Sequence, residues 1–194
     1  TPFKNGEVDW TSLKKLVRHQ LDGGVSGLVV GGTTAESPTL SSEEKQKIFD
    51  YVKAESGHAV PLVMGTGSNS TAETIAATKK AKAWGADAAL VVVPYYNKPS
   101  QRGLFLHYQA VAREGGLPVI LYNVPSRTIT KLDLSTIQDL SRVPGIVAIK
   151  EASGDLEFGG QIASTTNLML SSGDDGTYLP LVAKGGRGVI SVIS

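Results

Sequence analysis

Ile146-Val147-Ala148-Ile149-Lys150-Glu151-Ala152 is the stretch that decides the fold, because an apolar run ends there in a lysine. The core of the run, Val147 to Ile149, is typical of a buried strand in a parallel sheet, where both faces are covered and polar alternation disappears. A charged amine is costly to bury without a partner, so such a group is paired, neutral or peripheral. The role of Lys150 therefore depends on the elements around it.

Apolar runs of the same kind recur along the chain, and helical patterns separate them. The seven strand candidates are residues 27–32, 60–65, 88–94, 118–123, 145–150, 167–172 and 188–193. Ser41 and Ser70 each open an S-x-x-E pattern, which predicts a helix start with a capping box. Glycines that follow helical stretches, as expected at helix ends, stand at 23–24, 85, 115–116 and 185–186.

The repeat of strand, loop and helix favours either a closed (β/α)8 barrel or an open doubly wound sheet. The open sheet usually carries G-x-G-x-x-G, and the nearest candidate, residues 65–70, lacks the last glycine. We therefore expect a strand-to-helix turn there and an α/β fold of the (β/α)8 TIM barrel type. Only seven strands are found, and residues 1–3 resemble the loop after a missing first strand. A single partial barrel domain over 1–194, truncated at both ends, is the expectation.

Composition excludes several classes of protein. Lysine and arginine number 19 against 18 acidic residues, and no basic cluster indicates a nucleic-acid partner. The absence of cysteine excludes disulfides, thiolate metal sites and a cysteine nucleophile. His19, His58 and His107 are scattered without a ligand-like neighbour, so no metal is expected. No apolar run suits a membrane span, which predicts a cytoplasmic protein with no membrane partner.

Polar residues with chemical potential follow the apolar runs, where an active site of a (β/α)8 barrel lies. They include Thr33, Thr34, Thr66, Tyr95, Tyr96, Tyr122, Arg127 and Lys150. A lysine among apolar neighbours has a lowered pKa and can form an imine with a ketone. Tyr122 is placed to move the protons of that reaction, and Arg127 offers a fork for a carboxylate. Backbone amides around Thr33 and Thr34 offer a second anion site.

Plainer interpretations of these residues stay open. Lys150 at a strand end can pair with Glu151 or extend its amine to solvent. A single tyrosine at a strand end is often a core residue with a satisfied hydroxyl. Other lysines fall on helical patterns, where a solvated face explains them, so Lys150 alone needs a special account.

Five motifs together resemble the dihydrodipicolinate synthase family of pyruvate-dependent class I aldolases. They are Gly32–Ser37, Pro94–Pro99, Tyr122–Thr128, Ile149–Ala152 and Ser172–Asp175. The resemblance implies a lyase in which Lys150 forms a Schiff base with pyruvate. The resulting enamine would add to L-aspartate 4-semialdehyde and give 4-hydroxy-tetrahydrodipicolinate in L-lysine (diaminopimelate) biosynthesis. It also implies no cofactor beyond the covalent imine.

The resemblance further implies roles for individual residues. Tyr122, Thr33 and Tyr96 would form a proton relay, with Tyr96 coming from the neighbouring subunit of a homo-oligomer, a dimer of dimers and hence a homotetramer. Thr34 would hold the carboxylate of pyruvate and Arg127 that of the aldehyde. Gly173 and the carbonyl of Ile190 would line the site.

Other expectations concern regulation and departures from the family pattern. A possible effector pocket comprises Ser37, Asn69, Glu73 and Tyr95. Ser42 and Lys45 stand where lysine-inhibited relatives often carry histidines, which predicts weak or absent lysine feedback. Ala35 stands where glycine is common, and a positive φ there would cost roughly 1 kcal/mol. Most of the first strand and the C-terminal helices of the family are expected to be missing.

Two alternatives remain for the function. A sister aldolase acting on sugar acids shares the lysine and the tyrosine, although Arg127 suits a small carboxylated aldehyde better than a polyol. A non-catalytic fragment that keeps the fold without turnover is the second alternative.

Overall fold

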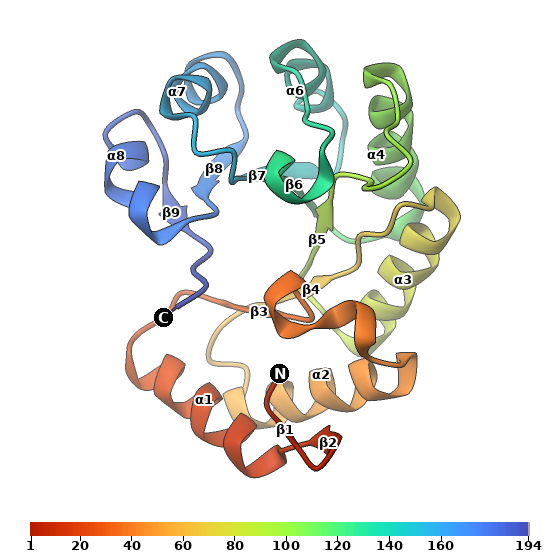
Figure 1. Ribbon diagram of the computed structural model, residues 1–194, viewed down its shortest axis with the longest axis vertical. Helices are drawn as coiled ribbons and strands as arrows, with labels where there is room; N and C mark the ends of the chain where they lie inside the picture. The colour runs from red at the N-terminus through yellow and green to blue at the C-terminus, as the bar shows by residue number, and fades with distance from the viewer. Residues whose placement is uncertain (194) are drawn as a thin grey trace.

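The computed structural model describes residues 1–193, and its centre is a curved parallel sheet with helices on the outer side (Figure 1). The strands are β3 (Leu28–Val30), β4 (Leu62–Gly65), β5 (Ala88–Val92), β6 (Val119–Asn123), β7 (Ile146–Glu151), β8 (Met169–Ser172) and β9 (Gly188–Val189). They lie in sequence order, and each neighbouring pair is parallel. This order is that of a (β/α) barrel, because a doubly wound sheet reverses its strand order. The predicted partial barrel is confirmed.

Helices cover the convex side of the sheet, except the short helix Pro125–Thr128, which lies beside the end of β6 (Figure 1). They are α1 (Trp10–Asp22), α2 (Ser42–Ser56), α3 (Thr71–Trp84), α4 (Gln101–Gly115), α5 (Pro125–Thr128), α6 (Leu134–Leu140), α7 (Leu156–Thr165) and α8 (Tyr178–Val182). Three short 3-10 turns, η1 (Thr33–Ala35), η2 (Ser37–Thr39) and η3 (Asp175–Thr177), follow strands β3 and β8. Within residues 1–193, no helix combines the length and the apolar character needed to cross a membrane.

The two predicted capping boxes differ in the structure. Ser41 forms the full box, since its hydroxyl accepts from the Glu44 amide at 3.1 Å and the Glu44 carboxylate accepts from the Ser41 amide at 2.8 Å. Ser70 caps α3 by accepting from the Glu73 amide at 3.3 Å. The Glu73 carboxylate instead accepts from the Ser68 hydroxyl at 3.0 Å. The second box is therefore only half formed, because the Ser68 hydroxyl bonds the carboxylate and itself accepts from the Ser70 amide at 3.2 Å.

The start of the chain departs from the prediction. Residues 1–3 were expected to be a loop, but Phe3 opens an antiparallel hairpin of β1 (Phe3–Lys4) and β2 (Glu7–Val8). Its turn, Asn5-Gly6, has positive φ angles of 55° and 83°. Asn-Gly is the preferred pair for such a two-residue turn. The predicted last strand is also too long, since β9 ends at Val189 and its partner β8 ends at Ser172.

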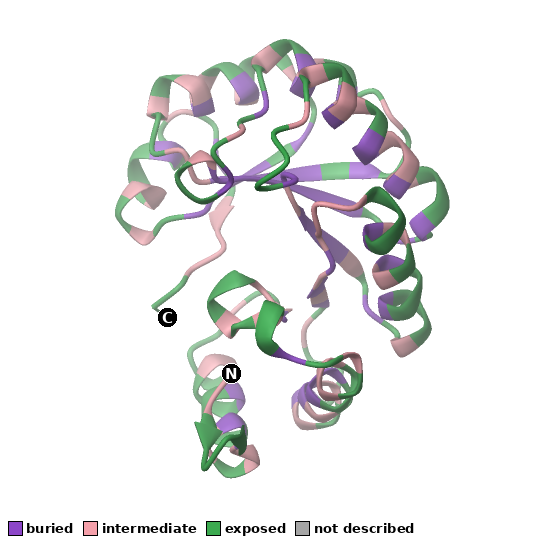
Figure 2. Cartoon of the chain, turned by 45° about the vertical axis from the view of Figure 1, so that its right-hand side comes forward, coloured by how far each residue is buried: buried purple, intermediate pink, exposed green. Residues whose placement is uncertain are grey.

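Most residues of β6 and β7 are buried (Figure 2), and their side chains alternate between two hydrophobic clusters. Tyr122 belongs to the cluster on the concave side of the sheet, together with Ile120 and Ala148. Leu121 and Ile149 belong to the larger core between the sheet and the helices. Successive side chains of a strand point to opposite faces. Lys150 therefore faces the concave side with Tyr122, whereas the next residue along each strand faces the helices.

Candidate active site

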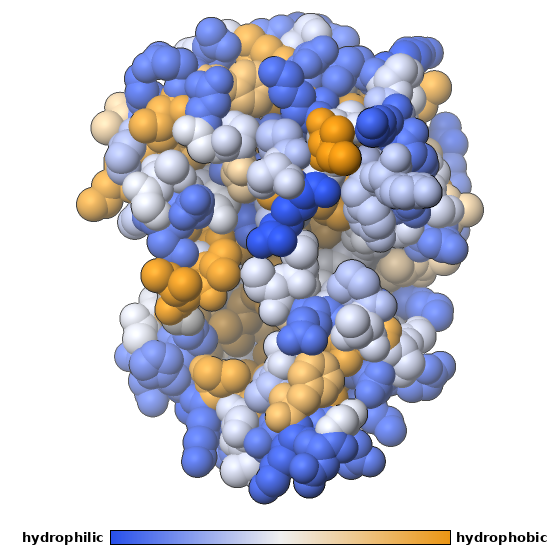
Figure 3. All heavy atoms as spheres, viewed as in Figure 1, coloured by the Kyte–Doolittle hydropathy of each residue, from blue (hydrophilic) through white to orange (hydrophobic). Residues whose placement is uncertain are grey.

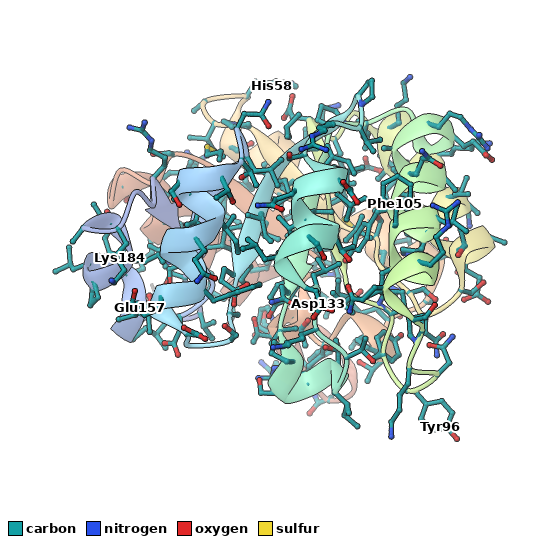
Figure 4. All side chains as sticks on the ribbon, turned by 90° about the horizontal axis from the view of Figure 1, so that it is seen from above. His58, Tyr96, Phe105, Asp133, Glu157 and Lys184 are labelled. Atoms are coloured by element: carbon teal, nitrogen blue, oxygen red, sulfur yellow. The ribbon has the colours of Figure 1, made fainter. Side chains whose placement is uncertain are left out.

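The loops after the parallel strands gather at one end of the sheet. Figure 4 shows this polarity, because His58, which precedes β4, and Tyr96, which follows β5, lie at opposite ends of the molecule. A cavity of about 720 Å³ opens at the end where the strands finish. Thr33, Tyr122 and Arg127 are among its lining residues. The face shown in Figure 3 is hollowed near its centre, and apolar side chains are visible within the hollow.

Lys150 is buried, with only 6% of its surface exposed, and it contacts the cavity-lining Tyr122 without lining the cavity itself. Its amine is 4.4 Å from the centre of the Tyr122 ring, and the two residues are direct partners in the β6–β7 register. Burial lowers the pKa of Lys150, the Asp175 carboxylate opposes that change, and the positive charge of Arg127 adds to it. The neutral, nucleophilic fraction of the amine is therefore enlarged.

The plainer interpretation of Lys150 as a partner of Glu151 is wrong. Glu151 faces the helices, where its carboxylate accepts from Asn123 Nδ2 at 2.7 Å and from the Ser153 amide at 2.6 Å. Within residues 1–193, none of the ion pairs includes Lys150. Lys150 therefore has no ion-pair partner among the described residues, and the Asp175 carboxylate acts on it from beyond ion-pair distance.

Tyr122 presents a protonated hydroxyl to the same region. Its side chain is buried, and burial raises the pKa of Tyr122, although the Arg127 guanidinium opposes the rise. The hydroxyl thus stays protonated at neutral pH, where it can donate a proton and recover it. Arg127 belongs to α5, the short helix that follows β6.

Gly173 packs directly against the lysine, although it is not among the residues that line the cavity. A Cβ at this position would lie 2.9 Å from Lys150 Cε and 2.5 Å from Ala152 Cβ. Only glycine fits this space. Ile190 packs on the concave-side cluster, and its amide donates to the Ser172 carbonyl at 2.9 Å.

Asp175, to which the sequence analysis gave no role, carries a carboxylate that acts electrostatically on Lys150. Its carboxylate accepts from the Ser191 hydroxyl and from the Val192 amide, and the Ser191 bond is the main reason that the pKa of Asp175 is lowered. A fixed negative charge near Lys150 stabilises a cation there, whether an ammonium or a protonated imine. Its position directly after β8 was the available signal.

The remaining predicted residues divide between the cavity and the surface. Thr33 lines the cavity from η1, whereas Thr34, next to it, is exposed and is not among the lining residues. Tyr96 is 86% exposed, has a positive φ of 73°, and extends away from the body of the molecule (Figure 4). Within the described chain, Tyr96 and Thr34 are therefore not brought to Lys150.

Most of the possible effector pocket opens into the same cavity. Ser37, Glu73 and Tyr95 line it, and so does Lys45. Asn69 is not among the lining residues, and its carbonyl accepts from the side-chain amide of Asn97 at 3.0 Å.

The strain considered at Ala35 is absent. Ala35 lies in η1, and the positive φ of this loop, 60°, falls on Glu36. The substitution of glycine by alanine at position 35 therefore carries no backbone cost.

Residues 1–193 contain no group of three or more His, Asp or Glu side chains placed to hold a metal ion. The buried His107 donates to or accepts from the Thr71 hydroxyl at 2.9 Å, so it serves helix packing.

Comparison with known proteins agrees with this geometry. The model of the Dihydrodipicolinate synthetase family matches residues 1–194. The chain belongs to the dihydrodipicolinate synthetase family. It is 55% identical to the 4-hydroxy-tetrahydrodipicolinate synthase of Bdellovibrio bacteriovorus over 196 residues, covering 100% of this chain and 67% of that relative. The same enzyme of Bacillus subtilis is 50% identical, with 100% and 68% covered.

Solved structures of the family share the fold. The dihydrodipicolinate synthase of Thermotoga maritima superposes with a TM-score of 0.98 at 40% identity, covering 100% of this chain and 68% of that one. The chloride-inhibited enzyme of Acinetobacter baumannii, solved in complex with pyruvate, gives 0.95 at 46% identity, with 98% and 66% covered. The resemblance drawn from the five motifs is confirmed.

Proposed function

We propose that this chain condenses pyruvate with L-aspartate 4-semialdehyde and forms 4-hydroxy-tetrahydrodipicolinate for L-lysine biosynthesis by the diaminopimelate route. The observation that carries the proposal is the buried Lys150 amine, which has a lowered pKa and lies against the Tyr122 ring. The names of the relatives, and the solved family member that holds pyruvate, point to the same reaction.

In the first step, the neutral amine of Lys150 attacks the keto carbon of pyruvate. The carbinolamine loses water and leaves a protonated imine, which withdraws electrons from the adjacent methyl group. Tyr122 supplies the proton that the leaving water needs. Thr33 and Tyr96 complete this relay in the proposal. Thr34 holds the pyruvate carboxylate, and Gly173 and the Ile190 carbonyl line the site.

In the second step, loss of a methyl proton converts the imine to an enamine, whose carbon adds to the aldehyde of the second substrate. Arg127 binds the carboxylate of that substrate, because guanidinium and carboxylate pair through two parallel hydrogen bonds. Attack by the amine of the second substrate on the imine carbon closes the ring and releases Lys150. The reaction needs no cofactor, since the lysine itself carries the covalent intermediate.

The proposed function also requires that several copies of the chain assemble. Tyr96 is too exposed to act within its own subunit, so we assign it to the site of a neighbouring subunit in a homo-oligomer, a dimer of dimers in the cytoplasm. One solved relative is described as a monomeric variant of the synthase, so the fold alone does not fix the assembly.

A substrate comparison tests the proposed reaction. The purified chain is incubated with pyruvate and either L-aspartate 4-semialdehyde or a polyol aldehyde, with Lys150→Ala as the control. The proposal predicts turnover of the semialdehyde alone, and none in the variant. Preference for the polyol would favour a sugar-acid aldolase, and no turnover of either aldehyde by the folded chain would favour the non-catalytic alternative.

Feedback by L-lysine is expected to be weak or absent. Lys45 and Lys80 line the cavity beside Glu73, and the Lys80 amine donates to the Ser42 hydroxyl at 3.0 Å. These positive charges disfavour a cationic ligand. Titration of the activity with L-lysine measures the effect, and a sub-millimolar inhibition constant would contradict the expectation.

A further inference from the structure

A buried chain of polar groups lies on the helix side of the sheet, directly behind the reactive face. Asn123 and Glu151 are 0% and 4% exposed, and they are opposite each other in the β6–β7 register. The Leu132 amide donates to Asn123 Oδ1 at 3.0 Å. Asn123 Nδ2 donates to Glu151 Oε2 at 2.7 Å, and the Ser153 amide donates to Glu151 Oε1 at 2.6 Å.

The direction of every hydrogen bond in this chain is fixed by its two ends. Both ends are backbone N–H groups, which can only donate. The Leu132 amide therefore sets the oxygen of the Asn123 side chain toward itself and turns the NH2 group toward Glu151. Glu151 must then accept on both oxygens, because its other neighbour is the Ser153 amide. A carboxylate meets this requirement and a carboxamide does not.

The same groups close the loop that carries Arg127. Asn123 is the last residue of β6, and Leu132, nine positions later, is fully buried and bonded to its side chain. Between them lies α5, whose last residue, Thr128, shares its hydroxyl proton between the Thr130 carbonyl at 2.7 Å and the Val124 carbonyl at 3.1 Å. The Asn123 side chain thus holds both ends of a loop that has Arg127 near its middle.

Glu151 also ties the strand ends that carry the reactive pair. It directly follows Lys150, and Asn123 directly follows Tyr122. In the backbone, the Ala152 amide donates to the Asn123 carbonyl at 2.9 Å. The side-chain bond between the two residues repeats this link on the helix side. A rotation of either strand end would move its reactive residue on the concave side.

We propose that Asn123 and Glu151 are positioning residues that fix the Arg127 loop and the Tyr122–Lys150 pair through this directed hydrogen-bond chain. The inference rests on the proposed function, since these hydrogen bonds would support the binding of the carboxylated aldehyde and the formation of the pyruvate imine. Neither side chain reaches the concave face, so neither is a catalytic residue.

Exchanging the two side-chain types tests the direction of the hydrogen bonds between Asn123 and Glu151. Glu151→Gln turns an NH2 group toward the Asn123 NH2 group, and Asn123→Asp turns a second carboxylate toward Glu151, so each single variant leaves one buried mismatch. The double variant Asn123→Asp with Glu151→Gln restores every bond, because the new carboxamide donates to the new carboxylate while both backbone donors keep an acceptor. Gln101→Ala is the matched control, since it removes two exposed bonds at the end of the same loop: the Gln101 side chain donates to the Lys131 carbonyl at 2.8 Å and accepts from the Asp133 amide at 3.0 Å.

Three quantities are measured for each variant: the melting temperature, the rate of pyruvate imine trapping by borohydride, and the KM for L-aspartate 4-semialdehyde. Each folded single variant is expected to raise that KM about 10-fold or more and to slow trapping, whereas the double variant and Gln101→Ala stay within about 3-fold of the parent. If a single variant does not fold, Glu151→Asp replaces it, because it keeps the charge but shortens the reach, and the same rise in KM is expected.

Several results would overturn the inference while the parent still forms the imine. They are single variants with parental KM and trapping, a double variant as impaired as the two single changes combined, or an equal loss in Gln101→Ala. A parent that forms no imine would instead contradict the proposed function, so the two failures are distinguishable.

Discussion

The Tyr122 ring packs against the Lys150 amine, and in the proposed function its hydroxyl moves the protons of the reaction. The variant Tyr122→Phe keeps the ring 4.4 Å from the amine and removes only the proton donor. We expect kcat to fall about 100-fold or more, which is the usual contribution of a general acid or base. The melting temperature should change little, since within residues 1–193 the hydroxyl forms no hydrogen bond that the buried core depends on. Steady-state kinetics with thermal melts measure both, and a kcat near that of the parent would remove Tyr122 from the relay.

The sequence singles out the candidate reactive residues more readily than the residues that hold them. Lys150 was identifiable because a lysine rarely ends a buried strand, and Tyr122 because it ends the neighbouring strand. The side chains of Asn123 and Glu151 form a hydrogen bond although they lie 28 positions apart in the sequence. In the sequence, both look like ordinary polar residues at strand ends. Only the sheet register places them together. Asp175 had the signal of its position after β8, but its distance from Lys150 depends on how η3 turns back.

The packing of α3 against α4 contains a buried histidine that couples stability to pH. His107 is 5% exposed, its Nδ1 pairs with the Thr71 hydroxyl, and its Nε2 has no partner within residues 1–193. Burial lowers the pKa of His107 to about 4. An unfolded histidine binds its proton near pH 6.5, so the unfolded state holds more protons between about pH 6.5 and 4. The free energy of unfolding should therefore fall across this window as pH decreases, by up to about 3 kcal/mol from this group.

Urea unfolding across that pH window checks the contribution of His107. His107→Asn places an amide near the position of Nδ1 but does not titrate, so the variant should lose less stability on acidification than the parent. The comparison between the two proteins cancels the contribution of the acidic residues. Equal pH dependence in both would mean that His107 is not the titrating group.

The strands that the sequence identified are those with a clear apolar pattern. Seven buried runs identified the seven strands of the sheet, because a parallel strand is apolar on both faces. The β1–β2 hairpin was missed although Asn5-Gly6 signals a turn, since strands of two residues carry no apolar pattern. The extent of β9 was overestimated because Ile190 and Val192 continue the apolar run, whereas strand length also depends on a pairing partner.

On the scale of the whole molecule, Tyr96 is the residue that the single chain leaves unexplained. It extends away from the sheet with 86% of its surface exposed, on a loop of positive φ. If it completes the site of a neighbouring subunit, a mixture of Tyr96→Phe and Lys150→Ala chains should recover activity after dissociation and reassembly. One site of each mixed pair then has both an intact lysine and an intact tyrosine. Activity no higher than that of the separate variants would show that Tyr96 does not act between subunits.

The central claim, that Lys150 is the nucleophile, is tested most directly by intact-mass spectrometry after incubation with pyruvate and borohydride. Borohydride reduces the imine to a stable secondary amine, so the adduct survives the measurement. The account predicts a single pyruvyl adduct on the parent chain and none on folded Lys150→Ala. An adduct that persists in the variant, or its absence from the folded parent, would contradict the account.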